Sequence, residues 1–182
     1  KMGYALAENA AAFGADVTLV HGPVRLADIP GVEMVETVTA DEMASEVLKR
    51  YEEADVVIMA AAVADYRPEK FYDEKVKKSD GDWNLRLVRN VDILKLLGEK
   101  KTKQKLVGFA AETENLLENA QKKLTKKNVD LLVANDVSRK DIGFGSDENE
   151  VFLLFRNGAK KKISKTSKEK IAQDVLSELS SL

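Results

Sequence analysis

An unbroken apolar run in the first third of the chain constrains the fold more than any other feature of the sequence. Residues 56–62 read Val-Val-Ile-Met-Ala-Ala-Ala, so apolar side chains occupy successive positions and not only alternate ones. A strand of this kind is apolar on both faces of its pleat, which suits a central strand covered by helices on both sides. We therefore predict a buried strand over 54–62.

The rest of the sequence alternates between strand and helix patterns. Thr39 and Glu42 have the spacing of a capping box, Thr166 and Glu169 repeat it, and Asn90 is placed to cap a helix. The pattern predicts strands over 16–21, 33–38, 85–88, 106–110 and 129–134, and helices over 2–13, 40–53, 91–97, 116–127 and 167–179.

This alternation predicts an α/β fold with a doubly wound, mostly parallel, Rossmann-like sheet and helices on both faces. Residues 147–162 are typical of a C-terminal hairpin that turns at Asn157-Gly158. A chain of 182 residues suits one domain over 1–182. Such a fold normally begins with a strand and a tight loop, but this sequence begins within its first helix. We expect the first strand and loop to be missing from these residues.

Composition excludes several function classes. The 29 basic and 31 acidic residues leave a formal net charge of −2, which provides no global field for nucleic acid or an anionic membrane. The chain has no cysteine, so a thiol nucleophile, a thiolate metal site and disulfides are all excluded. No apolar run approaches the ~20 residues that span a membrane, and we expect a cytoplasmic protein.

Polar groups follow three of the predicted parallel strands. Ligands in open α/β sheets bind beyond the carboxyl ends of the strands, which here are followed by residues 60–67, 108–113 and 134–137. Small residues there let a ligand approach the backbone, and the three segments together indicate one site. Asp65 also fits a solvated acid at a packing turn, and Phe109 also fits a core position.

Two basic regions could neutralise a polyphosphate. Lys75-Val76-Lys77-Lys78 lies in the segment 63–84, which lacks a sustained period and is longer than most connections within a domain. A charge run is, however, most often a solvated surface. Asp92, in the first turn of the helix over 91–97, would repel a phosphate, so that turn suits a sugar, a base or capping of the helix dipole.

The helix over 116–127 carries the second basic region. A rotation of ~100° per residue places Lys123 and Lys127 beside the apolar stripe of this helix, whereas Lys122 and Lys126 fall nearly opposite it. The first pair can therefore lean over a ligand, and the second pair faces solvent.

Five short motifs, in this order, resemble the bacterial phosphopantothenoylcysteine synthetases of coenzyme A biosynthesis. They are Lys1-Met2-Gly3, Ala61-Ala62-Val63-Ala64-Asp65-Tyr66, Lys75-Val76-Lys77-Lys78, Gly108-Phe109-Ala110-Ala111-Glu112-Thr113 and Ala134-Asn135-Asp136. The resemblance implies a ligase in which the carboxylate of 4′-phosphopantothenate attacks the α-phosphate of CTP and releases pyrophosphate. The amine of cysteine then attacks the acyl-cytidylate and displaces CMP, and Mg²⁺ is the expected cation.

The resemblance also implies which residues form the site. Lys75 would neutralise the triphosphate and is the expected catalytic side chain, and Asp65 would contact the nucleotide or its Mg²⁺. The CTP-binding residues implied in this way are Met59, Ala60, Ala61, Asp65, Lys75, Val91, Asp92, Ile93, Leu94, Phe109, Lys123 and Lys127.

The chain departs from the family pattern at two places. Val91 stands where the family usually has proline, which only presets the first helical turn. An asparagine and a Ser-Ser-Gly stretch, which in the family serve phosphate binding, would precede Lys1 and are absent from this sequence. The family is dimeric, and Phe71 to Val88 matches the region that reaches toward its partner. A phosphopantothenoylcysteine decarboxylase is a further expected partner.

Two other functions remain open on the residues alone. An NAD(P)-binding Rossmann-type oxidoreductase or a nucleotide-binding module would share the fold, although neither G-x-G-x-x-G nor a P-loop motif occurs in the sequence. A non-enzymatic interaction domain is the third interpretation. Stabilisation by particular nucleotides would distinguish the three.

Overall fold

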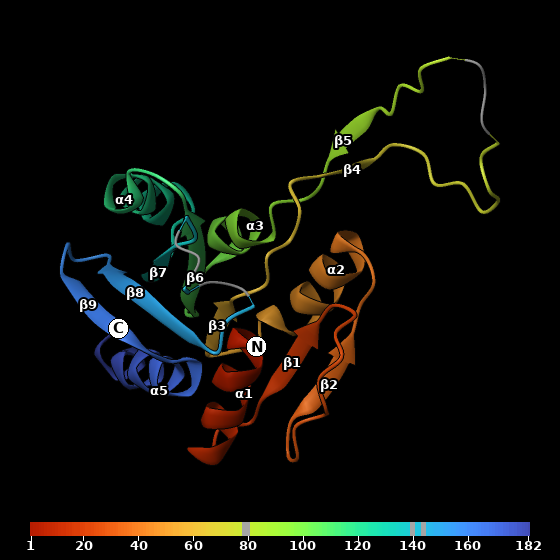
Figure 1. Cartoon of the computed structure of the whole chain (residues 1–182). Helices are drawn as coiled ribbons and strands as arrows, with labels where there is room; N and C mark the ends of the chain where they lie inside the picture. Colours follow the sequence, from red (N-terminus) through yellow and green to blue (C-terminus); the bar gives the residue numbers. More distant parts are fainter. Residues whose placement is uncertain (78–80, 139–140, 143–144) are drawn as a thin grey trace.

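The computed structural model describes residues 1–182 except 78–80, 139–140 and 143–144 (Figure 1). Its main sheet has five strands in the order β3-β6-β7-β8-β9. The strands are β3 (Val56–Met59), β6 (Lys105–Glu112), β7 (Leu131–Asp136), β8 (Glu148–Phe155) and β9 (Lys160–Ser167). The first three run parallel and the last two are antiparallel, which confirms the mostly parallel sheet and the terminal hairpin.

Helices cover both faces of this sheet (Figure 1). They are α1 (Met2–Ala12), α2 (Ala40–Tyr51), α3 (Ile93–Lys100), α4 (Leu116–Lys126) and α5 (Lys168–Glu178), with a 3₁₀ turn η1 (Leu179–Ser181). One core cluster joins α2, α3 and α4 to Leu106 and Leu132, and the other joins α1 and α5 to Val107 and Leu131. Successive residues of β6 and β7 therefore enter opposite cores, as the continuous apolar pattern of buried parallel strands predicts. Within the described part of the chain, no helix combines the length and the apolar character that crossing a membrane requires.

Two further strands form a separate parallel pair. They are β1 (Thr18–His21) and β2 (Glu33–Glu36), which pair from Thr18 with Glu33 to His21 with Glu36. Among the described residues, β1 pairs only with β2 and β3 only with β6. One edge of β3 is therefore not hydrogen-bonded to another strand, and its first residue, Val56, is exposed although it is apolar.

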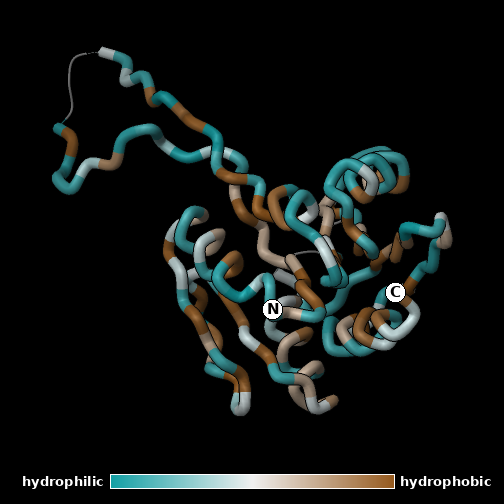
Figure 2. Tube along the Cα trace, turned by 180° about the vertical axis from the view of Figure 1, so that it is seen from behind, coloured by the Kyte–Doolittle hydropathy of each residue, from teal (hydrophilic) through white to brown (hydrophobic). Residues whose placement is uncertain are grey.

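A ribbon of two short strands projects from the body of the molecule. The strands β4 (Tyr66–Pro68) and β5 (Leu87–Arg89) pair antiparallel, and we call residues 66–89 the extension. Figure 1 shows it standing away from the helices and the main sheet, and Figure 2 shows hydrophobic stretches along it. The strand predicted over 85–88 thus exists in part, but it belongs to this ribbon and not to the main sheet.

The central strand is shorter than the sequence predicts. We expected a strand over 54–62, but β3 ends at Met59 and residues 60–65 form no regular element. Small residues provide little side-chain packing to hold a strand, and here the backbone leaves the sheet toward the extension.

One predicted helix cap is confirmed and two are wrong. Thr39 and Glu42 form the reciprocal capping box of α2. Thr166 does not cap α5, because it is paired with Asn149 in the hairpin, and Ser167 caps the helix by accepting from the Lys170 N–H. Asn90 does not cap α3 either.

The cap of α3 is Asp92, which accepts a hydrogen bond from the Lys95 N–H at 3.1 Å. Two glycines then let α3 pack closely. A Cβ on Gly108 would lie 2.6 Å from a methyl group of Leu94, so α3 rests directly on β6. A Cβ on Gly98 would lie 1.9 Å from the carbonyl oxygen of Lys127, just after α4. These two contacts fix α3 against β6 and against the end of α4.

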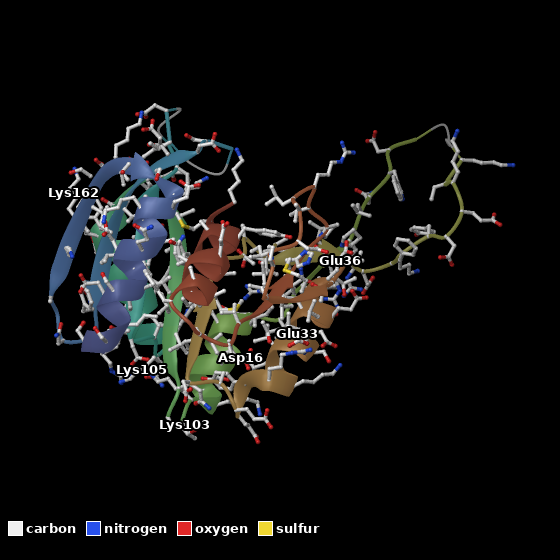
Figure 3. All side chains as sticks on the ribbon, turned by 90° about the horizontal axis from the view of Figure 1, so that it is seen from below. Asp16, Glu33, Glu36, Lys103, Lys105 and Lys162 are labelled. Atoms are coloured by element: carbon white, nitrogen blue, oxygen red, sulfur yellow. The ribbon has the colours of Figure 1, made fainter. Side chains whose placement is uncertain are left out.

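The outer edge of the sheet is β9, which is rich in lysine. Lys160, Lys161 and Lys162 follow one another there and are exposed; Figure 3 shows Lys162 on the outer side of the molecule. Lys161 pairs with Glu178 of α5 at 2.5 Å, and Lys162 pairs with Glu150 at 3.2 Å.

Candidate functional site

The carboxyl ends of β3, β6 and β7 lie side by side at one edge of the sheet. Met59 is in register with Gly108, and Glu112 is in register with Asp136. The predicted segments 108–113 and 134–137 therefore lie side by side, and the segment 60–67 begins beside Gly108 before its backbone leaves the sheet toward the extension. Figure 3 shows Lys103 and Lys105 instead near the start of β6, at its opposite end.

The apolar residues of the predicted site are divided between the two faces of the sheet. Met59 and Val91 pack against the core beneath α3 and α4, whereas Ala60 and Phe109 pack against the core beneath α1 and α5. The side chains of Ile93 and Leu94 are buried in the first core. The remaining predicted contact, Ala61, is exposed after the end of β3. Ile93 and Leu94 can therefore offer a ligand their backbone but not their side chains.

Asn90 joins the residues just before β4 to the start of α3. Its backbone N–H donates to the carbonyl oxygen of Asp65 at 2.9 Å, and its side-chain amide donates to that of Ala64 at 2.8 Å. Arg67 donates to the Asn90 side-chain oxygen at 2.9 Å. Sequence reasoning treated Asn90 only as a helix cap and missed this role, because its partners lie about 25 residues away in the chain.

Lys123 and Lys127 both turn toward this edge of the sheet. Lys123 Nζ lies 2.7 Å from Glu112 Oε1 at the end of β6, and Lys127 Nζ lies 3.1 Å from Asp92 Oδ1 at the start of α3. Lys122 instead pairs with Glu118 on the outer face of α4. That hydrogen bond lowers the pKa of the Glu118 carboxyl below its ordinary value. The placement predicted from helical angles is confirmed for these three lysines.

Lys75 lies in the extension, apart from these pairs. It is exposed, and no ion pair joins it to another described residue. Figure 3 shows the outer part of the extension standing clear of the other elements, whereas Arg67 at its base pairs with Asp41 of α2 at 3.3 Å. Within one chain, the structure does not bring Lys75 to Lys123 or Lys127, so its catalytic role stays a prediction. Lys78, from the same basic motif, is outside the described residues.

Asp65 is the protein ligand that the sequence predicts for a magnesium ion. The Asp65 carboxylate is exposed beyond β3, and the described residues hold no group of three or more His, Cys, Asp or Glu placed to bind a metal ion. Mg²⁺ bound with a nucleotide usually takes one or two carboxylates and fills its remaining positions with phosphate oxygens and water. A single carboxylate at a strand end fits this kind of coordination and does not fit a closed protein cage.

The fold and the placement of these groups define a Rossmann-like α/β domain with a polar site at the carboxyl ends of its parallel strands. A family model described as DNA/pantothenate metabolism flavoprotein C-terminal domain matches residues 1–182. The chain belongs to this family. This confirms the resemblance found in the five sequence motifs.

The curated relatives are longer proteins. The chain is 48% identical over 183 residues to the coenzyme A biosynthesis bifunctional protein CoaBC of Bacillus subtilis (strain 168), covering 100% of this chain and 45% of that protein. It is 41% identical to the protein of the same name from Haemophilus influenzae, covering 98% of this chain and 44% of that protein. The chain thus spans less than half the length of these relatives.

Solved structures confirm the fold. The crystal structure of the C-terminal domain of a CoaBC protein matches with a TM-score of 0.83 at 40% identity, covering 98% of this chain and 80% of that one. A Cab2 mutant in complex with phosphopantothenate-cysteine matches with a TM-score of 0.64 at 18% identity, covering 81% and 53%. At that identity, the second match supports the fold alone.

Proposed function

We propose that this chain is the ligase part of a coenzyme A biosynthesis protein and joins 4′-phosphopantothenate to cysteine at the expense of CTP. The observation that carries the proposal is the pair of lysines, Lys123 and Lys127, held at the carboxyl ends of parallel strands in a member of this family. A carboxylate is a poor acyl donor, so amide formation needs a leaving group. Cytidylylation supplies one, and fixed positive charge favours the departure of pyrophosphate.

In this proposal, each group has a defined task. The backbone of residues 59–61 and 91–94 and the ring of Phe109 would bind the nucleoside, and Lys123 and Lys127 would bind its phosphates. Asp65 would hold Mg²⁺, which supplies charge neutralisation on the phosphates when it is bound. Lys75 would contact the triphosphate where pyrophosphate leaves. The chain needs no nucleophile of its own, because the substrate carboxylate and the cysteine amine are the attacking groups.

The extension supports a homodimer as part of the same proposal. Phe71 is 89% exposed and Trp83 62% exposed, and the rings of Tyr72 and Trp83 meet edge to face with 6.3 Å between their centroids. Aromatic side chains this exposed gain free energy when another surface covers them. We infer that Phe71 to Val88 of each copy packs against the other copy, which the molecular mass in solution would check.

Two further parts of the proposal concern the longer protein. We propose that a parallel strand preceding Lys1 pairs with the free edge of β3, which would complete the sheet between β3 and β1 and deliver the phosphate-facing loop to α1. We also propose that a phosphopantothenoylcysteine decarboxylase accompanies this ligase in the cytoplasm, in keeping with the bifunctional relatives.

A nucleotide panel tests the proposed function against its alternative. The melting temperature of the full-length protein would be measured with CTP, ATP, GTP, UTP and NADPH in the presence of Mg²⁺, together with pyrophosphate release. We expect CTP to stabilise most, and pyrophosphate to appear only when 4′-phosphopantothenate is added. Stabilisation by NADPH without any preference for CTP would favour the oxidoreductase instead.

The two faces of α4 give a matched mutational prediction. Lys123→Ala and Lys127→Ala should each weaken CTP binding by about 10- to 100-fold, because a charge-assisted contact to phosphate is worth about 1.5–3 kcal/mol. Lys122→Ala and Lys126→Ala, on the outer face, should change the dissociation constant less than twofold. Calorimetric titration measures the dissociation constant for CTP of all four variants. Equal losses of affinity from the two pairs would contradict the assignment of Lys123 and Lys127 to the phosphates.

A further inference from the structure

Glu112 is a nearly buried carboxylate at the end of β6 to which the proposed reaction assigns no task. Its side chain is 11% exposed, and its Oε1 is covered and accepts no hydrogen bond from the described residues, but it lies 2.7 Å from Lys123 Nζ as an ion pair. Its backbone oxygen accepts from the Val137 N–H at 3.0 Å, and the strand register pairs it with Asp136. The backbone that carries this carboxylate is therefore fixed by the sheet.

The pair with Lys123 differs from an ordinary surface ion pair. A carboxylate with so little access to water is costly unless a cation compensates it, and Lys123 is the cation that does so. The side-chain amide of Asn119 reaches the other oxygen only at 3.5 Å. The outer pair on the same helix, Lys122 with Glu118, is 69% and 67% exposed, and such pairs contribute little.

The geometry leaves Lys123 with free hydrogen-bonding capacity. A lysine ammonium has three donors on a flexible stem, so an unheld lysine loses conformational entropy when it binds a ligand. Lys123 is itself 43% exposed, although its partner is almost covered. The Lys123 side chain is therefore paired with Glu112 and still reaches solvent, from which a phosphate can approach it.

We propose that Glu112 is a positioning residue for the nucleotide: it holds the Lys123 ammonium beyond the end of β6 before the triphosphate arrives. This inference rests on the proposed function, since it needs a phosphate at Lys123. It adds a residue that makes no contact with the ligand and acts only through Lys123. Without the carboxylate, the Lys123 side chain moves freely before CTP binds. It then loses conformational entropy when CTP binds, and this loss weakens the binding.

The test is a double-mutant cycle in the full-length protein, with CTP binding measured by calorimetry. Glu112→Gln keeps the shape of the side chain and removes its charge. We expect it to weaken CTP binding about tenfold, to raise the KM for CTP and to leave the KM for cysteine unchanged. In a Lys123→Ala background, the same substitution should have no further effect on CTP binding. Glu118→Gln is the matched control and should bind CTP as the wild type does.

The outcomes separate this inference from the proposed function. Wild-type protein that does not bind CTP overturns the proposed function. If the wild-type protein binds CTP, two results overturn the inference alone. One is that Glu112→Gln binds CTP as tightly as the wild type or more tightly, and the other is that its loss of affinity adds to the loss caused by Lys123→Ala. If Glu112→Gln lowers the melting temperature strongly, Glu112→Asp replaces it; the carboxylate then sits one methylene further back, and weaker CTP binding is again required.

Discussion

Lys75→Gln is expected to lower pyrophosphate release by about 10²–10³-fold, the size of loss seen when one preorganised group is removed from a transition state. The substitution removes positive charge from the extension and no contact from either core, because Lys75 is exposed. The melting temperature should therefore be unchanged. The measurement is a steady-state pyrophosphate assay on the full-length protein at saturating CTP.

Lys70→Gln is the matched control for this prediction, since Lys70 is also an exposed lysine of the extension. It should release pyrophosphate at close to the wild-type rate. Near-normal release by Lys75→Gln would show that Lys75 is only a solvated lysine, and equal losses from both variants would point to a general effect of charge on the extension.

Gly98→Ala is expected to destabilise the fold by about 3 kcal/mol, at the upper end for overpacking a tight site. Alanine is favoured over glycine within a helix by about 1 kcal/mol, so propensity alone predicts the opposite sign. The contact at the end of α4 decides whether the fold gains or loses stability. The added Cβ would lie 1.9 Å from the backbone oxygen of Lys127, and backbone atoms move aside less readily than the tip of a side chain. The same shift would separate Lys127 from Asp92 and weaken CTP binding.

Urea unfolding of Gly98→Ala measures this loss directly as a change in the free energy of unfolding. Gly22→Ala is the control, because the nearest atom to a Cβ there is the Thr37 carbonyl oxygen at 4.0 Å, an ordinary contact distance. A stability of Gly98→Ala equal to or above that of the wild type would mean that α3 can move away from α4 without cost, and that the two helix ends are not rigidly placed.

The parts of the fold that were predictable depend on local signals. The capping box of α2 is readable because its two partners are three residues apart, and the hairpin because Asn157-Gly158 marks its turn. The ribbon was predictable only in part: the alternation over 85–88 indicates β5, but nothing in the sequence indicates β4 or the pairing of the two strands. Both strands lie outside the two cores, and Tyr66 pairs with Arg89, 23 residues away.

In the candidate site, too, the features within one element were predictable and the contacts between elements were not. Helical angles alone place Lys123 beside the apolar stripe of α4 and Lys122 opposite it, because both residues and the stripe belong to the same helix. The acidic partners Glu112 and Asp92 could not be assigned in advance, because each comes from another element that only the folded sheet brings near. The cap of α3 was misassigned for a related reason: Asn90 and Asp92 are both good capping residues, and contacts of Asn90 with residues 64 and 65 decide between them.

The lysines of β9 also affect behaviour at high concentration. A sheet edge with unpaired backbone groups is a template for strands of other molecules, and like charges along it oppose such growth. Lys160, Lys161 and Lys162 would face their counterparts if two molecules aligned these edges. Crowded solutions should therefore resist fibrillar association along this side, and exchanging the three lysines for threonine would remove that protection.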